Sequence, residues 1–119
     1  MHSAAFAAAL LCAALPPAAE AATKIARQAV GAIAYHRASG SYGWSVDQPT
    51  ARRAKIEALK QCGDPRCEVV ASLRNNCGAI ANGPKKFIVG KGATRQEAQT
   101  KALKACSANC EIVVWACTR

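Results

Sequence analysis

The feature that most constrains this chain of 119 residues is a short pattern that occurs twice. Gly-Ala-Ile-Ala at residues 31–34 returns at residues 78–81. Ala-Leu-Lys-Gln-Cys at residues 58–62 returns as Ala-Leu-Lys-Ala-Cys at residues 102–106, and in each copy a second cysteine and an acidic, β-branched run follow. A duplication with cysteines at matching places predicts two copies of one structural unit held by disulfides.

The first 21 residues have the features of a secretory signal. The Ala- and Leu-rich run at residues 3–15 is shorter than the roughly 20 residues that cross a bilayer. Ala19 and Ala21 frame an Ala-x-Ala site, so we predict a signal peptide over residues 1–21 and a tail over residues 22–29. The protein would then be secreted or periplasmic, without stable membrane insertion after cleavage. An uncleaved anchor is the alternative.

Cleavage would leave six of the seven cysteines, because only Cys12 lies in the signal. An even number of cysteines in a short exported chain predicts a disulfide framework. Cleavage would also remove Glu20 but no lysine or arginine, so the mature chain is more basic than the full chain, whose formal net charge is +9. Such a chain has room for one domain with a modest core, which needs cross-links more than a larger domain does.

Hydrophobic patterns predict the order strand, strand, helix, strand in each copy. In the first copy the expected elements are strands at residues 30–35 and 42–46, a helix at 50–61 and a strand at 68–74. In the second they are strands at residues 78–81 and 87–89, a helix at 94–105 and a strand at 111–116. One such unit could not bury both faces of its own sheet. We therefore predict a single α+β domain over residues 30–119, with two helices packed on antiparallel sheet and repeats at about 30–76 and 77–119.

The two expected helices differ in their first turn. Thr94 and Glu97 form a capping box in the second, whereas the first has Arg53 at the place of the glutamate. The first helix carries small residues at helical spacing, and Ile56 and Leu59 are expected to widen this buried stripe. The small residues are Ala51, Ala54, Ala58 and Cys62.

Spacing also predicts how the cysteines pair. In each copy one cysteine ends the helix and the next follows after a short turn, close enough for a disulfide. The expected pairs are Cys62 with Cys67, Cys106 with Cys110 and, by elimination, Cys77 with Cys117. By chain entropy the short loops would stabilise by about 2 kcal/mol each and the long one by about 4 kcal/mol. A zinc site is the alternative, but four-cysteine zinc modules favour closer Cys-x-x-Cys spacing.

Several of these motifs together resemble a known family. Gly-Ala-Ile-Ala, Tyr-Gly-Trp-Ser at residues 42–45, a helix ending in Ala-Leu-x-x-Cys and the sequence Asn-x-Cys-Gly-Ala-Ile-Ala are similar to the small secreted bacterial proteins grouped as domain of unknown function 4189. The resemblance covers residues 30–117, although residues 84–93 are rich in lysine and lack the tryptophan of the first copy. It implies export and disulfides, and no established active site.

Few residues suggest catalysis. His36 is the single histidine of the mature chain and lies at an expected hairpin end, where a solvated side chain is the common case. Glu68 and Glu111 begin equivalent strands and would form a carboxylate pair if the copies brought them together, although strand-end carboxylates commonly face water. With six cysteines paired, no thiol nucleophile remains. We therefore expect no catalytic residue, no metal site and no cofactor.

The positive charge favours an anionic partner, such as an acidic protein or a cell-envelope component. Export and the lack of interleaved aromatic and basic residues argue against nucleic acid. Tyr35, Tyr42 and Trp44 form either an exposed strip for protein binding or, as we expect, part of the core against the helices. The basic clusters are candidates for binding, with a solvated face as the alternative. The candidate binding residues are Tyr42, Trp44, Lys85, Lys86, Lys91, Arg52 and Arg53.

Three classes of function fit these features. We prefer an exported, non-enzymatic binding or inhibitor module on a rigid disulfide scaffold. The others are a structural envelope protein without a specific ligand and, less favoured, a hydrolase that uses Glu68 and Glu111. Because the cysteines specify a scaffold, we expect function to reside where the two copies differ.

The disulfide framework can be tested by counting thiols in the exported, unreduced protein under denaturing conditions. We expect no free thiol, because all six mature cysteines are paired. Six reactive thiols, or bound zinc, would contradict the framework.

Overall fold

The structure is a computed structural model that describes residues 29–119. The predicted signal peptide and residues 22–28 of the predicted tail lie outside the described residues. The elements are β1 (Val30–His36), β2 (Ser41–Gln48), α2 (Ala51–Cys62), β3 (Glu68–Arg74), β4 (Cys77–Asn82), β5 (Phe87–Gly92), α3 (Arg95–Cys106) and β6 (Glu111–Cys117). This is the predicted element order, with most strands one to three residues longer than expected.

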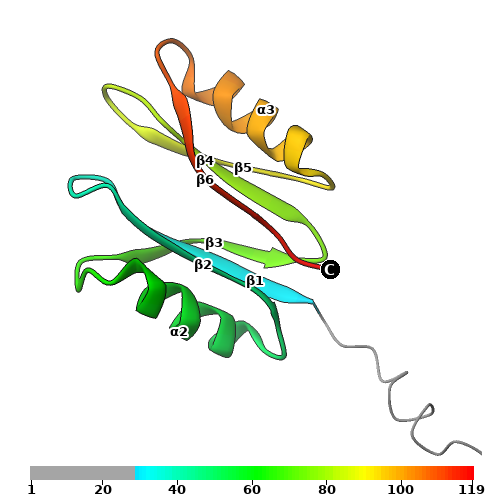
Figure 1. The fold of residues 1–119 in the computed structure, drawn as a ribbon. Coiled ribbons are helices and arrows are strands. Elements are labelled where there is room, and N and C mark those ends of the chain that lie inside the picture. Colours follow the sequence, from blue (N-terminus) through cyan, green and yellow to red (C-terminus); the bar gives the residue numbers. More distant parts are fainter. Residues whose placement is uncertain (1–28) are drawn as a thin grey trace, which may run out of the picture.

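Two antiparallel sheets of three strands each form the centre of the domain. In one sheet β1 lies between β2 and β3, and in the other β4 lies between β5 and β6. Figure 1 shows the sheets face to face, with α2 on the outer face of one and α3 on the outer face of the other. The predicted α+β class is confirmed, and its antiparallel strands are divided between two sheets.

The core between the sheets depends on the alternation of side chains along the central strands. In β1, Ile33 and Tyr35 face the other sheet, whereas Ala32 and Ala34 face α2. In β4 the same alternation directs Ile80 to the other sheet. Ile33 and Ile80 are both fully buried. The Gly-Ala-Ile-Ala motif therefore supplies one large side chain to the shared core and small ones to the helix contact.

Small residues on both sides let each helix lie very close to its sheet. In α2 the buried residues are Ala54, Ala58 and Cys62, and in α3 they are Ala98, Ala102 and Cys106. Ile56 and Leu59 are 43% and 38% exposed, so the prediction that they widen the buried stripe is wrong. A helix that touches its sheet through alanines buries only a narrow face, and large side chains beside that face remain in solvent.

A threonine caps the first turn of both helices. The hydroxyl of Thr50 accepts the Arg53 N–H at 3.1 Å, and that of Thr94 accepts the Glu97 N–H at 3.1 Å. In α3 the Glu97 carboxylate also accepts the N–H of Ala93 at 3.2 Å and pairs with Lys101 at 2.9 Å. The hydrogen bond from Lys101 and the Ala93 N–H lower the pKa of Glu97. Only α3 has the glutamate of a capping box, as predicted.

The structure confirms the three expected disulfides. Two of them close the helix-to-strand connections, Cys62 with Cys67 and Cys106 with Cys110. The third joins Cys77 to Cys117, which are directly paired residues of β4 and β6. The two short bridges are thus local, and the long one ties the last strand to the centre of its sheet.

Side chains at both ends of the sheets connect the two halves of the domain. At one end Arg37 donates to the Asn82 side chain at 3.1 Å and to the Gly83 carbonyl at 2.8 Å. At the other end Thr118 accepts the Asp47 N–H at 2.9 Å, and the Asp47 carboxylate accepts the Arg119 N–H at 2.9 Å. The Asp47 contacts join the end of β2 to the residues that follow β6. Within residues 29–119 no helix has the length and apolar character needed to cross a membrane.

The close helix contact can be tested with Gly90→Ala. A Cβ atom there would collide with the backbone of α3, at Ala98 O and at Ala102 N, 2.5 Å away. Because backbone cannot yield as a flexible side chain does, we expect destabilisation by about 1–3 kcal/mol or more in urea unfolding. Lys91→Ala changes the adjacent exposed residue and serves as the control. Equal stability of the two variants would contradict the close contact.

Candidate functional site

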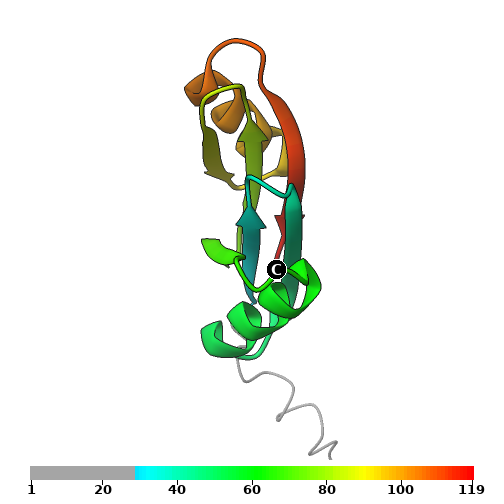
Figure 2. The ribbon, with the colours of Figure 1, turned by 90° about the vertical axis from the view of Figure 1, so that its left-hand side faces the viewer.

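An apolar groove runs along one edge of the domain, where β2 and β6 lie beside each other. Figure 2 shows β6 next to β2 at this edge, and β5 and β3 on the opposite side of the domain. The groove has a volume of about 390 Å³. We call it the aromatic groove, and its lining residues are Tyr42, Trp44, Val46, Val113, Val114, Trp115, Ala116 and Cys117.

Two aromatic side chains of β2 project into this groove from one face of the strand. Tyr42 and Trp44 are 43% and 42% exposed, and their rings lie 6.3 Å apart at 27°. The prediction that they are buried against the helices is wrong, because Gly43 and Ser45 take the side of β2 that faces α2. There the Ser45 hydroxyl donates to the Ala54 carbonyl at 2.6 Å. Tyr42 and Trp44 therefore lie on the opposite side of the strand.

The third aromatic of the predicted strip behaves differently. Tyr35 is 4% exposed and packs edge-on against Phe87, with ring centroids 5.1 Å apart. Burial raises the pKa of its phenol, and Glu111 adds to this effect while Arg37 opposes it. Tyr35 belongs to the core between the sheets, so only Tyr42 and Trp44 remain as exposed candidates from the first half.

Sequence reasoning missed Trp115, which lines the groove, and its contact with Arg95. Trp115 of β6 is 39% exposed, and the Arg95 guanidinium at the start of α3 lies 4.0 Å from the centre of its ring. Such a cation–π contact orients the arginine over the aromatic face. The strand pattern of β6 could have indicated this exposure, because Trp115 stands between Val114 and Ala116. Those two side chains are buried, so the Trp115 side chain points to the other face of the strand. The contact of Arg95 with Trp115 depends on how α3 and β6 lie in space, so the sequence gives no sign of it.

The two edges of the domain differ in charge. Residues 41–46 of β2 and 112–117 of β6 contain no charged side chain. At the opposite edge β3 begins with Glu68 and ends with Arg74, and β5 carries Lys91. Charges on an edge strand discourage pairing with another chain. The edge at the aromatic groove lacks this protection over six consecutive residues of each strand.

The basic candidates do not form one surface. Lys85 and Lys86 lie in the turn between β4 and β5, whereas Arg52 and Arg53 begin α2 at the other end of the domain (Figure 1). Arg53 also lies 3.7 Å from Glu57. The predicted basic residues are exposed, but the structure separates them from one another and from Tyr42 and Trp44.

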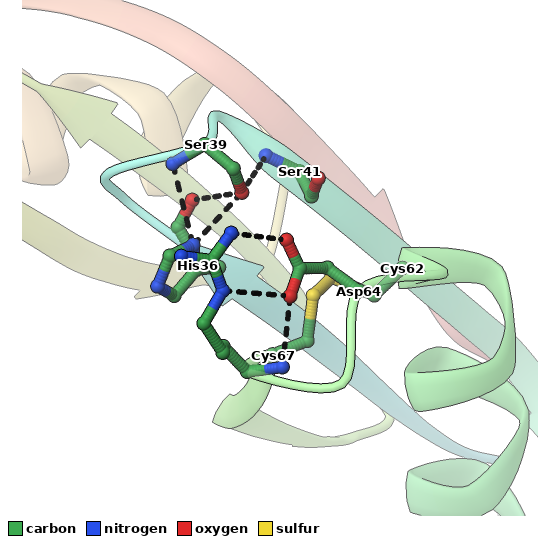
Figure 3. The surroundings of a disulfide bond; sticks show 7 residues. His36, Ser39, Ser41, Cys62, Asp64 and Cys67 are labelled. Atoms are coloured by element: carbon green, nitrogen blue, oxygen red, sulfur yellow. Dashed lines mark hydrogen bonds and ion pairs between the residues drawn. A yellow bond between two sulfur atoms is a disulfide. The ribbon is translucent and has the colours of Figure 1, made fainter.

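A more polar depression of about 550 Å³ lies at the opposite edge, and both of its arginines, Arg37 and Arg66, are engaged within the protein. Its lining includes His36, Arg37, Arg66 and Glu68. Nδ1 of His36 lies 2.8 Å from the Ser39 hydroxyl and accepts the Ser39 N–H. Figure 3 shows this cluster beside the disulfide of Cys62 and Cys67. His36 is thus the last residue of β1, at the hairpin end as expected, and its side chain has a local partner.

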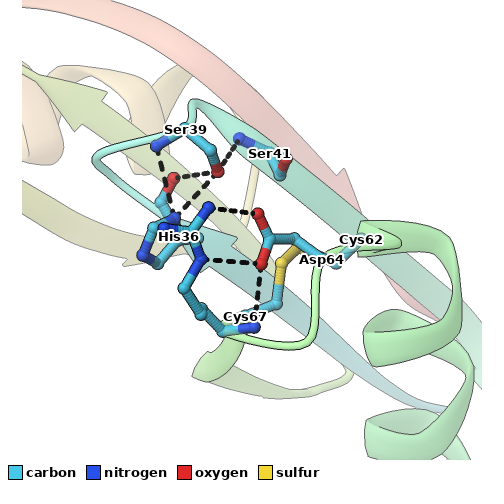
Figure 4. A network of polar contacts seen from close by, with 7 residues as sticks. His36, Ser39, Ser41, Cys62, Asp64 and Cys67 are labelled. Atoms are coloured by element: carbon cyan, nitrogen blue, oxygen red, sulfur yellow. Dashed lines mark hydrogen bonds and ion pairs between the residues drawn. A yellow bond between two sulfur atoms is a disulfide. The ribbon is translucent and has the colours of Figure 1, made fainter.

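Asp64 completes this cluster but does not activate His36. The Arg66 side chain donates to both carboxylate oxygens, at 3.1 and 3.0 Å, and the Arg66 N–H donates at 2.8 Å. These contacts hold the pKa of Asp64 well below its usual range. In Figure 4 dashed lines join His36 to Ser39, and none joins His36 to Asp64. A catalytic triad would instead place histidine between serine and carboxylate.

Glu68 and Glu111 lie at different edges of the domain. Glu68 begins β3 and lines the polar depression with Phe87 of β5, whereas Glu111 begins β6, the strand beside β2. Both are exposed at their strand starts, which agrees with solvated strand ends rather than with a shared site. Among residues 29–119, no three His, Cys, Asp or Glu side chains gather in a way that could hold a metal ion.

Comparison with known proteins places the chain in a family without an assigned activity. The profile of the family described as "Domain of unknown function (DUF4189)" matches residues 30–117. The chain is 41% identical over 87 residues to the uncharacterized protein Rv1813c of Mycobacterium tuberculosis, covering 73% of this chain and 59% of the relative. It is 39% identical over 87 residues to protein Rv1269c of the same species, with 68% of that relative covered. The chain thus spans less than two thirds of the length of Rv1813c.

A solved structure agrees with the fold described above. The NMR structure of Rv1813c superposes with a TM-score of 0.61 at 30% identity, over 98% of this chain and 94% of that one. The α+β architecture is therefore shared with a relative.

The Asp64 cluster predicts a specific pH dependence of stability. A carboxyl whose pKa is lowered on folding stabilises the protein above its unfolded pKa, about 3.9, and this contribution is lost as the pH falls through the folded pKa. We expect Asp64→Asn to unfold at lower urea concentration than wild type at pH 7, with the difference shrinking below about pH 4. A difference that stays constant down to the most acidic condition would contradict this role of Asp64.

Proposed function

This chain belongs to the DUF4189 family, whose domain has no known function, and we propose that it is an exported, non-enzymatic binding module whose binding site is the aromatic groove. The observation that carries the proposal is the exposure of Tyr42, Trp44 and Trp115 around one apolar groove of about 390 Å³. Tyrosine and tryptophan are enriched among the residues that dominate binding energy at protein interfaces. Three of them lie at the edge of a domain cross-linked by three disulfides.

The proposed partner is an acidic protein or an anionic component of the cell envelope. The chain carries a formal net charge of +9, and a field of that sign attracts and steers anionic partners. Three disulfides in so small a domain support an oxidising, extracytoplasmic location. An aromatic groove supplies short-range affinity, and the distributed lysines and arginines supply long-range attraction.

Capture of partners from an extract of exported proteins and envelope material tests this proposal. We expect wild type to retain a partner at low salt and release it at high salt, since screening weakens long-range charge attraction. Trp44→Ala should lose at least about tenfold in affinity, because it removes a central aromatic contact.

Val89→Ala is the matched control. Val89 pairs with Ile80 as Trp44 pairs with Ile33, but it lies on β5, away from the aromatic groove. This variant should bind like wild type. Equal loss in both variants, or the absence of any salt-sensitive partner, would overturn the proposal.

A further inference from the structure

We infer that the partner binds as an extended acidic segment that adds a strand to the free edge of β2 and places alternate side chains in the aromatic groove. This inference rests on the proposed function and specifies how the groove is used.

The outer edge of β2 is available for pairing. β2 is the edge strand of its sheet, and no strand within the described part of the chain pairs with its outer side. The uncharged stretch at residues 41–46 would span about 20 Å in an extended conformation, enough to pair with a segment of similar length. The Ser41 N–H donates to the Ser39 hydroxyl and the Val46 C=O accepts the Gln48 side-chain amide, so the outward backbone groups between these two residues would bond the partner backbone. Backbone pairing of this kind gives affinity independent of sequence.

The aromatic groove lies where such a strand would need side-chain pockets. Tyr42, Trp44 and Val46 occupy alternate positions on one face of β2, and that face looks toward β6. A strand added beside β2 would direct every second side chain to the same face. Apolar residues at those positions would contact Tyr42, Trp44 and Val46 and lie along the edge of β6, while the intervening residues would point to the other side of the sheet.

Charge indicates that the intervening and flanking residues of the segment are acidic. The intervening residues would point to the side of the sheet that α2 covers, and α2 carries Arg52, Lys55 and Lys60.

The flanking residues would lie near two arginines of the second half. Arg95 stands over Trp115 at the groove, and Arg119 follows two residues after Cys117 of its lining. The nearby Asp47 carboxylate already accepts the Arg119 N–H and contacts the Thr118 hydroxyl, so it is satisfied within the protein. A second copy of this chain would bring another net charge of +9 to the interface, whereas an acidic segment would be attracted.

Synthetic peptides test the inference on the oxidised full chain. The probe is a capped heptapeptide that alternates Glu and Val, and its charge control alternates Lys and Val. We expect the Glu peptide to bind, to slow hydrogen exchange at amides of residues 41–46, and to lose at least about tenfold in affinity with Trp44→Ala but not with Val89→Ala. The Lys peptide should not bind.

Two N-methylated versions of the Glu peptide separate strand addition from simple groove binding. Methyl groups on the amides that face β2 should abolish binding, whereas methyl groups on the other amides should be tolerated. Equal tolerance of both versions, or no binding of the Glu peptide, would overturn the inference. If envelope partners were nevertheless captured through Trp44, the proposed function would stand without strand addition.

The oligomeric state tests whether a second copy of this chain, rather than an acidic segment, occupies the edge of β2. Sedimentation should show a monomer without peptide. A dimer whose formation alone protects the amides of residues 41–46 would assign the edge to a second copy and overturn the inference.

Discussion

Each three-stranded sheet of this domain has two apolar faces but only one helix to cover them, and the rest of the structure follows from that mismatch. The helix side is lined by alanines and admits only a closely packed, narrow helix face. The other side carries Ile33, Tyr35 and Leu73 in one sheet and Ile80 and Val114 in the other, so the two sheets must cover each other. Stability of either half therefore depends on its partner, and the disulfides act on a fold that this contact defines.

Two stacked three-stranded sheets leave two edges, and these edges differ in their charged and aromatic side chains. One edge has charges on both of its strands, including Lys91. In the first half, Val46 of β2 stands at the position of Lys91. Instead of charges, β2 exposes Tyr42 and Trp44, which line the aromatic groove together with Trp115 of β6. Aromatic exposure on an uncharged edge strand invites association, which a domain avoids unless the surface is used. The functional proposal follows from this difference between halves that otherwise share their core pattern.

Much of the fold was predictable, because its signals are local. Alternation and helical spacing predicted the element order, and short turns between cysteines predicted the two local disulfides. The exposure of Ile56 and Leu59 was not predictable, since it follows from how close α2 lies to its sheet. Nor was the exposure of Tyr42 and Trp44, which follows from the position of β2 at an edge. The contact of Arg95 with Trp115 joins two elements through space and leaves no mark on local sequence.

The central claim, that the edge between β2 and β6 is the binding surface, can be tested with fluorotryptophan labels. The chain contains two tryptophans, Trp44 and Trp115, and both line the aromatic groove. Fluorine NMR of the labelled protein should therefore give two signals that both report on this site. We predict that both signals shift as the Glu-Val peptide is added, saturating at the affinity measured by calorimetry. Heat of binding with both tryptophan signals unmoved would contradict the account.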